Sequence, residues 1–122
     1  MGHDALRQQI EAAFRDRSLL AQPGYADAVR EVIGLLDRGE VRVATKAASG
    51  EWVTHAWLKE AILLYFGVQQ MEPSEAGPLG FNDKLPIKKN LKEQGVRVVP
   101  PGTVRHGAFL EPGAIVMPGY VN

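Results

Sequence analysis

Residues 98–122 read VVPPGTVRHGAFLEPGAIVMPGYVN, and this stretch decides the predicted fold because its residue types recur with a period of six. Each six-residue unit begins with an aliphatic residue and has glycine in fourth place: the units start at Val104, Leu110 and Val116, and the glycines are Gly107, Gly113 and Gly119. This period is typical of a parallel β-helix, in which each flat face sends one aliphatic side chain to the axis and then turns a corner. Three units form one triangular coil. The alternatives are an ordinary β-meander with turns and an irregular tail rich in proline and glycine.

The first forty residues predict a pair of amphipathic helices. Asp4 is expected to cap a helix that ends near Arg17, and Asp27 is expected to open a second helix that stops at Gly39. Both carry apolar residues at the spacing of one buried stripe. The stripes are Leu6, Ile10, Ala13 and Phe14 in the first helix and Val29, Val32, Ile33 and Leu36 in the second.

The next segment predicts a hairpin and a central helix. EVRVAT and GEWVTH are short valine-rich runs separated by a turn, which indicates two paired strands. Thr54 is expected to cap the helix HAWLKEAILLYF, which is apolar around much of its circumference and should end at Gly67. The other helices should pack against it. The aromatic residues of this helix and of the hairpin are interpreted as part of the core rather than as a cofactor site. They are Trp52 in the hairpin and Trp57, Tyr65 and Phe66 in the helix.

Residues 72–95 are polar and predict no long element. EPSEAGPLGFND is interpreted as a surface loop, and IKKNLKEQG as at most a short polar helix with solvated lysines. A domain boundary is expected at Gly95, which gives a helical domain over 1–95 and the start of a hexapeptide-repeat β-helix over 96–122. The predicted fold class is α+β. Because one coil cannot bury its own axis, we expect the chain to be cut short after Asn122.

Composition narrows the class of function. The chain has 122 residues, 45% of them hydrophobic, which suits one main domain. Lysine plus arginine equals aspartate plus glutamate at 14 each, so the basic excess that binds nucleic acid is missing. The sequence has no cysteine, no signal peptide pattern and no apolar run long enough to cross a bilayer. We therefore expect a cytoplasmic protein with neither a nucleic-acid nor a membrane partner.

Several motifs carry a family resemblance that extends over nearly the whole chain. VIGLLDRGEVRVA, EWVTHAWLKEAILLYF, NDKLP, GVRVVPPGTVRHGAF and VMPGYVN occur in order and with similar spacing. Together they resemble the N-terminal part of the bacterial tetrahydrodipicolinate N-succinyltransferases. The resemblance implies an enzyme of lysine and diaminopimelate biosynthesis that moves a succinyl group from succinyl-CoA to the amino group of ring-opened tetrahydrodipicolinate. It also implies a homotrimer, a left-handed β-helix and active sites between neighbouring subunits.

The resemblance assigns one substrate-binding residue to this chain. Arg97 corresponds to a family position that binds the dicarboxylate substrate, and a guanidinium suits that role because its planar fork donates two parallel hydrogen bonds to a carboxylate. Lys84 in NDKLP is a weaker candidate, with an exposed loop lysine as the alternative. The catalytic carboxylates and most of the CoA site belong to later coils in the family. We therefore name no catalytic residue, leave the CoA site unknown, and expect succinyl-CoA as a co-substrate without a bound cofactor.

The histidines are given no catalytic role. His106 occupies a variable position of the family pattern and is interpreted as a turn residue facing water. His55 is expected to make a hydrogen bond in a partly buried setting. The spacing of the three histidines, at positions 3, 55 and 106, does not indicate a metal site. Tyr120 stands where the repeat usually has a small residue, and marks either the passage to a next coil or a subunit contact.

Two other functions stay open on sequence grounds. One is a non-catalytic module in which a short β-helix only trimerises or docks the helical domain. The other is a related serine or sugar acyltransferase. The sequence that follows Asn122 in the gene distinguishes them, because an enzyme needs further hexapeptides with acidic residues facing a subunit groove.

Overall fold

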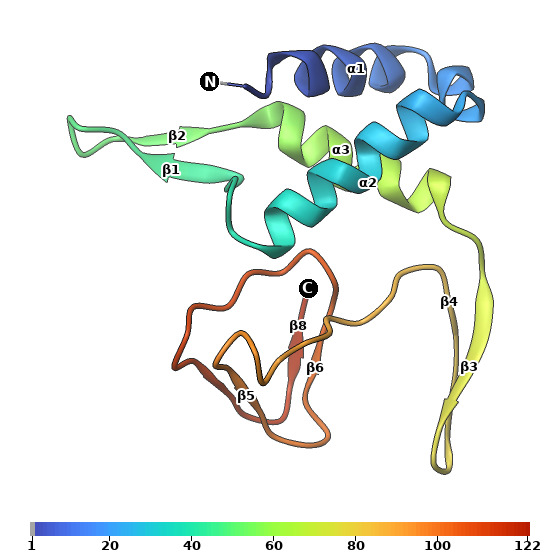
Figure 1. Ribbon diagram of the computed structural model, residues 1–122, viewed down its shortest axis with the longest axis vertical. Coiled ribbons are helices and arrows are strands. Elements are labelled where there is room, and N and C mark those ends of the chain that lie inside the picture. Colours follow the sequence, from blue (N-terminus) through green and yellow to red (C-terminus); the bar gives the residue numbers. More distant parts are fainter. Residues whose placement is uncertain (1) are drawn as a thin grey trace.

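Three α-helices form the first half of the protein (Figure 1). The computed structural model describes residues 2–122, in which α1 spans Asp4–Arg15, α2 spans Pro23–Asp37 and α3 spans Ala56–Val68, with a short 3-10 helix at Arg17–Ala21. The predicted stripes of α1 and α2 point into one core, which confirms their amphipathic interpretation. The buried residues of this core are Ile10, Ala13, Val29, Val32, Ile33, Leu36, Leu58, Ala61, Leu64 and Tyr65.

The predicted helix ends were wrong by one to four residues. His3, not Asp4, is the N-cap of α1, and His55, not Thr54, is the N-cap of α3. The second helix begins at Pro23 rather than at Asp27, since the fixed φ of proline suits the first helical position and its missing N–H costs nothing there. Gly67 lies inside α3, which continues to Val68.

The predicted hairpin after α2 is confirmed. Strand β1 (Ala44–Lys46) pairs antiparallel with β2 (Trp52–Thr54). The His55 ring Nε2 lies 2.7 Å from Thr45 Oγ1, so this half-buried histidine makes the expected hydrogen bond. The aromatic prediction was correct only in part, because Tyr65 is buried whereas Trp52 is 69% exposed. Trp52 lies on a two-stranded hairpin whose six strand residues are all exposed.

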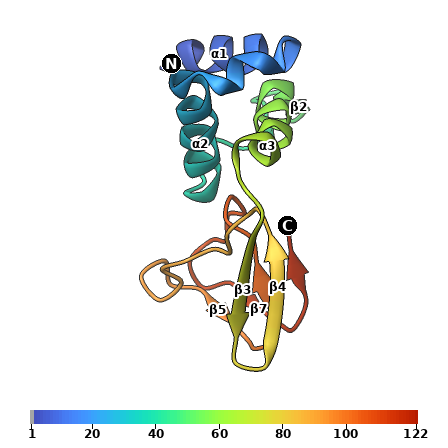
Figure 2. The ribbon, with the colours of Figure 1, turned by 90° about the vertical axis from the view of Figure 1, so that its right-hand side faces the viewer.

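A second hairpin replaces the predicted surface loop at 72–83. Strand β3 (Glu72–Ala76) pairs antiparallel with β4 (Leu79–Asp83), and every residue of both strands is exposed. Gly77 has φ +61° and is followed by Pro78, whose ring holds φ negative. A positive φ followed by a negative φ is what a two-residue type II′ turn requires. Strand propensities missed this hairpin because glycine, proline and acidic residues are rare in strands. It points away from the helices, beside the last segment in Figure 1 and in front of it in Figure 2.

Parallel pairing joins the beginning and the end of the last segment. Strand β5 (Arg97–Val98) pairs with β7 (Ile115–Val116), and β6 (Thr103–Val104) pairs with β8 (Tyr120–Val121). The partners Val98 and Val116 are eighteen residues apart, which is three six-residue units. This parallel register excludes the antiparallel meander and the irregular tail. Of the three predicted axial residues, Val104 is buried, whereas Leu110 and Val116 are half-buried.

Residues 87–95 form a bridge and a turn, which agrees with the prediction of at most a short polar helix for IKKNLKEQG. Ile87 bridges Arg105 in antiparallel fashion, and the Lys88 N–H donates to the carbonyl oxygen of Val104 at 2.8 Å. A turn over 91–95 follows and leads into β5. Hydrogen bonds thus already tie residues on the N-terminal side of Gly95 to the coil, and the domain boundary at Gly95 stays a prediction. The three helices of residues 2–122 are all too short or too polar to cross a bilayer.

Candidate functional site

The predicted substrate ligand Arg97 lies on the outer side of the coil. It begins β5 and is the cross-strand partner of Ile115, while the next pair, Val98 and Val116, is half-buried. Because successive residues of a strand point to opposite faces, Arg97 and Ile115 share the outward face. Arg97 is exposed and makes no side-chain hydrogen bond or ion pair within residues 2–122. Its guanidinium is therefore available to an anion.

Lys84 has an intramolecular acceptor instead. Its Nζ donates to the carbonyl oxygen of Phe66 at 2.9 Å, in the last turn of α3. A cation is favoured there because the carbonyls at a helix C-terminus carry partial negative charge. Lys84 follows the β3–β4 hairpin and Arg97 lies on β5, and no hydrogen bond or ion pair within residues 2–122 joins them through a shared partner. Lys84 holds the start of the C-terminal segment against α3.

A charged cluster that the sequence did not indicate joins α2 to the coil. Asp37 Oδ1 accepts from Lys88 Nζ and from the Gly107 N–H, each at 2.8 Å, and Lys88 Nζ also donates to the Asp37 carbonyl oxygen at 2.8 Å. His106 Nδ1 lies 3.4 Å from the same carboxylate oxygen. The prediction of a solvated lysine at 88 was wrong. The prediction for His106 was correct in part, because the residue lies in a turn with 32% of its side chain exposed but its Nδ1 faces Asp37.

Burial gives this cluster its structural weight. The Lys88 side chain is fully buried and that of Asp37 is only 14% exposed. A buried ammonium is costly unless it is paired and hydrogen-bonded, and here two oxygens of one residue satisfy it. We name Asp37, Lys88, His106 and Gly107 the junction cluster. Its geometry serves to fix the last segment against the end of α2.

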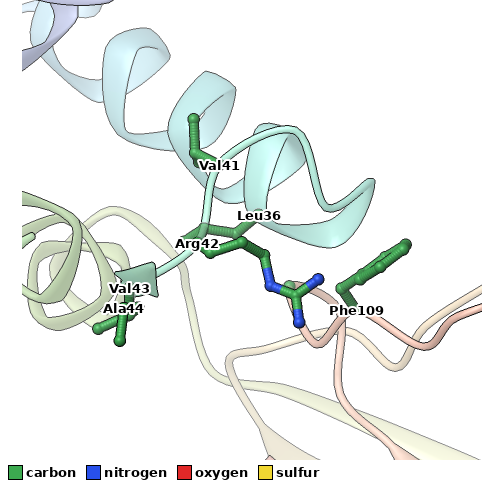
Figure 3. A pocket seen from close by; sticks show the side chains of 7 residues that line it. Leu36, Val41, Arg42, Val43, Ala44 and Phe109 are labelled. Atoms are coloured by element: carbon green, nitrogen blue, oxygen red, sulfur yellow. The ribbon is translucent and has the colours of Figure 1, made fainter. Parts of the chain in front are cut away.

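A shallow cleft opens beside the junction cluster (Figure 3). It has a volume of about 320 Å³ and lies between the end of α2, the start of β1 and the coil. The Arg42 guanidinium points at the ring of Phe109, with 4.8 Å between its central carbon and the ring centroid, which is within cation–π range. The residues lining the cleft are Leu36, Val41, Arg42, Val43, Ala44, Gly107 and Phe109.

Phe109 also lines a larger cleft of about 590 Å³ on the side of residues 90–94. Arg38 and Glu93 provide charges of both signs there, and Arg38 is already paired with Glu40. Neither cleft contains Arg97 or Lys84. Among residues 2–122, no group of three or more histidine, aspartate or glutamate side chains is placed to hold a metal ion. The clefts therefore separate two packed regions and bring no catalytic set together.

The resolved pKa shifts are likewise not concentrated at one site. Burial raises the pKa of the Tyr65 hydroxyl in the helical core. Hydrogen bonds from Arg7 to Glu11 and from Arg38 to Glu40 raise the pKa of each guanidinium further above its ordinary value. Within residues 2–122, Arg97 is one of several exposed cations that no carboxylate engages, and its guanidinium suits a carboxylate.

Comparisons with known proteins place the chain beside one enzyme. A family model described as the N-terminal part of tetrahydrodipicolinate N-succinyltransferase matches residues 5–68. A 2,3,4,5-tetrahydropyridine-2,6-dicarboxylate N-succinyltransferase of Variovorax paradoxus is 46% identical, over 96% of this chain and 46% of its own length. Relatives of the same name from Albidiferax ferrireducens and Aeromonas salmonicida are 43% and 45% identical. The chain spans about half the length of the curated relatives it matches.

Proposed function

Because the chain belongs to the tetrahydrodipicolinate N-succinyltransferase family, we propose that it forms the N-terminal part of an enzyme that transfers a succinyl group from succinyl-CoA. The acceptor is the amino group of ring-opened tetrahydrodipicolinate, in lysine and diaminopimelate biosynthesis. The amine attacks the thioester carbonyl, an amide bond forms and the CoA thiol leaves. The observation that carries this proposal is the identity of 46% along 96% of the chain with an enzyme of that name.

The parallel register supports a β-helix as the frame of this enzyme. An eighteen-residue offset between β5 and β7 is what three hexapeptide faces produce in one turn of a triangular coil. The partners in the β6–β8 pair are seventeen residues apart, one fewer than in the β5–β7 pair. We propose that this is the first coil of a left-handed β-helix. The hand is taken from the family resemblance, because general connection rules favour right-handed crossovers.

Arg97 is proposed as a ligand of the dicarboxylate acceptor. Two features support the role: the guanidinium faces outward from β5, and no carboxylate of the chain engages it within residues 2–122. Desolvating a surface arginine costs little free energy when it binds a carboxylate, and the fork geometry of the guanidinium adds specificity. The acid–base groups that catalyse transfer and the CoA site are proposed to lie in the part of the relatives that this chain does not span.

The assembly and location follow from the same family. We propose a cytoplasmic homotrimer in which active sites form between neighbouring subunits. Succinyl-CoA acts as a co-substrate and no resident cofactor is required by amine acylation. The 122-residue chain by itself is then expected to be inactive.

Succinyl transfer tests the proposal directly. Release of the CoA thiol from succinyl-CoA is followed with tetrahydrodipicolinate as acceptor, for the full-length protein and for residues 1–122. The full-length protein should turn over and residues 1–122 should not. Absence of acceptor-dependent thiol release by the full-length protein would refute the function, and turnover by residues 1–122 would show that the catalytic groups are misplaced.

Arg97 is tested in the full-length enzyme by the substitution Arg97→Lys. The variant keeps the charge and loses the fork, which should cost about 1.5 to 3 kcal/mol of acceptor binding, or roughly ten- to a hundredfold in affinity. The response to succinyl-CoA should change much less. Arg15→Lys, at an exposed position in the last turn of α1, is the matched control. An unchanged acceptor KM would remove Arg97 from the site.

A further inference from the structure

An exposed isoleucine lies beside Arg97 on the outward face of the β5–β7 pair. Ile115 is the cross-strand partner of Arg97 and is 59% exposed. Neighbouring strands of a sheet lie about 5 Å apart, so the two side chains leave the sheet next to each other. The aliphatic stem of an arginine often covers an apolar neighbour of this kind, but Ile115 stays mostly exposed. The pair therefore presents a cation and an aliphatic surface side by side.

Exposure alternates along this part of the chain. Ala114 and Val116 are half-buried, whereas Ile115 between them is exposed. An outward strand position that only meets water usually carries a polar group. The other parallel pair follows that rule, because Thr103 and Tyr120, which stand opposite each other there, both carry a hydroxyl group. Ile115 instead offers a surface that suits an apolar part of a ligand.

The proposed acceptor combines the two chemical groups that this pair suits. A 2,3,4,5-tetrahydropyridine-2,6-dicarboxylate has methylene groups at ring positions 3, 4 and 5, between the two carbons that bear the carboxylates. Ring opening turns these methylene groups into a flexible chain. When Arg97 binds one carboxylate, the chain that follows it lies within reach of the neighbouring Ile115.

We infer that Ile115 is a specificity-determining residue of the acceptor site, because it packs against the methylene chain of the dicarboxylate that Arg97 binds. This inference rests on the proposed function, from which it takes the acceptor. Arg97 supplies charge-assisted hydrogen bonds, whose strength does not depend on chain length. Ile115 supplies apolar contact, which grows with each buried methylene group. Arg97 thus selects for a carboxylate, and Ile115 selects for an unsubstituted hydrocarbon chain attached to it.

A series of straight-chain monocarboxylates separates the two contributions. Acetate, butanoate and hexanoate are compared as competitors of the acceptor in succinyl transfer by the full-length protein. In the parent, each added methylene group should lower the inhibition constant about two- to fourfold, the upper value being full burial of one CH₂. Ile115→Thr keeps a β-branched side chain that suits a strand, and should reduce this factor to less than about 1.5-fold. Arg97→Lys should weaken all three acids by a similar factor and leave the dependence on length unchanged.

The matched control is Ile87→Thr. Ile87 is 60% exposed, as Ile115 is to within one per cent, but it bridges Arg105 rather than Arg97. This variant should keep the dependence on chain length of the parent. An unchanged dependence in Ile115→Thr, or an equal loss in Ile87→Thr, overturns the proposal.

Binding is also measured without catalysis. The δ-methyl NMR signal of Ile115, identified as the signal that Ile115→Val lacks, is followed in the isoleucine-labelled full-length protein while pimelate, a straight-chain dicarboxylate, is added. A saturable shift that Arg97→Lys weakens supports the contact, and an unmoved signal overturns it. A saturable shift in a protein that transfers no succinyl group would refute the proposed function and leave the contact standing.

Discussion

The helical region and the coil solve the problem of a hydrophobic core in different ways. In the helices, side chains from α1, α2 and α3 meet around one centre, and Ile10, Val29 and Leu64 have no exposed surface at all. In the coil, Val104 is buried but Leu110 and Val116 stay half-buried. The three helices enclose a core by themselves, whereas the last segment leaves two of its three repeat-starting aliphatic residues partly exposed.

The coil is therefore held to the helices by other means. The junction cluster supplies charge-assisted hydrogen bonds between Asp37, Lys88 and the Gly107 N–H, and Phe109 packs over Gly39 and Arg42. An apolar core therefore organises the helical region, whereas directional polar contacts position the coil. Four changes test whether this division is correct.

The largest effect should come from the helical core. Leu64→Ala removes a fully buried side chain of α3 and should lower the free energy of unfolding by about 2 to 5 kcal/mol, because the cavity relaxes only in part. Urea unfolding followed by circular dichroism measures the loss. The neighbouring Leu63→Ala, at a position 40% exposed, should cost much less. If hydrogen exchange in residues 97–121 rises as much as in α3, the two regions are one cooperative unit and the division is wrong.

The junction cluster should give the next largest effect. Asp37→Asn keeps the shape but leaves the buried ammonium of Lys88 without a counter-charge, at a cost of about 1.5 to 3 kcal/mol. Exchange should accelerate at the Gly107 N–H and in β6 before it does in α3. Asp27→Asn on the exposed side of α2 is the control, since its ion pair with Arg30 is a surface pair worth little. Equal acceleration of hydrogen exchange in the helical core would contradict the view that the junction cluster only positions the coil.

Steric contact between the regions should give a smaller effect. Gly39 has φ +71°, and an added Cβ would lie 2.7 Å from the Phe109 ring. Gly39→Ala should cost about 1 to 2 kcal/mol from the left-handed backbone alone, and should also displace the ring. Gly24→Ala, in the first turn of α2 with open space around it, should be neutral or stabilising. The aromatic NMR signals of the Phe109 ring report the displacement. Unchanged signals would show that Phe109 is not packed against Gly39.

The smallest effect should appear with pH in the helical core. Burial raises the pKa of Tyr65 above its ordinary value of 10.0, so the folded state holds this proton more tightly than the unfolded state does. The resulting stability is present in full below pH 10 and is lost as the pH rises through the folded pKa. Urea midpoints between pH 8 and 11 should fall less in Tyr65→Phe than in the parent. An equal fall would assign the loss to other groups.

Local patterns in the sequence were sufficient for the elements and the family. The stripes of Ile10 and Val29 and the valine-rich runs around Trp52 each predicted an element that the structure contains. The six-residue period agrees with the parallel pairing of β5 with β7, and the β-helix itself stays a prediction. The hairpin at 72–83 could not be predicted this way, because its residues have low strand propensity and only the turn at Gly77 and Pro78 signals it. For the candidate site, sequence indicated Arg97 through the family motif, whereas its free outward position became visible only in the fold.

By itself the sequence determined the helices, the repeat and the family, because these depend on residues a few places apart or on motifs that can be read directly. The tertiary structure alone decided which charges are buried and which apolar groups are exposed. Lys88 reads as one of two adjacent surface lysines, yet it pairs with Asp37, 51 residues earlier. Gly107 binds the same carboxylate from 70 residues away. Such contacts carry no local signal, because their free energy exists only after the helices and the coil have brought the partners together.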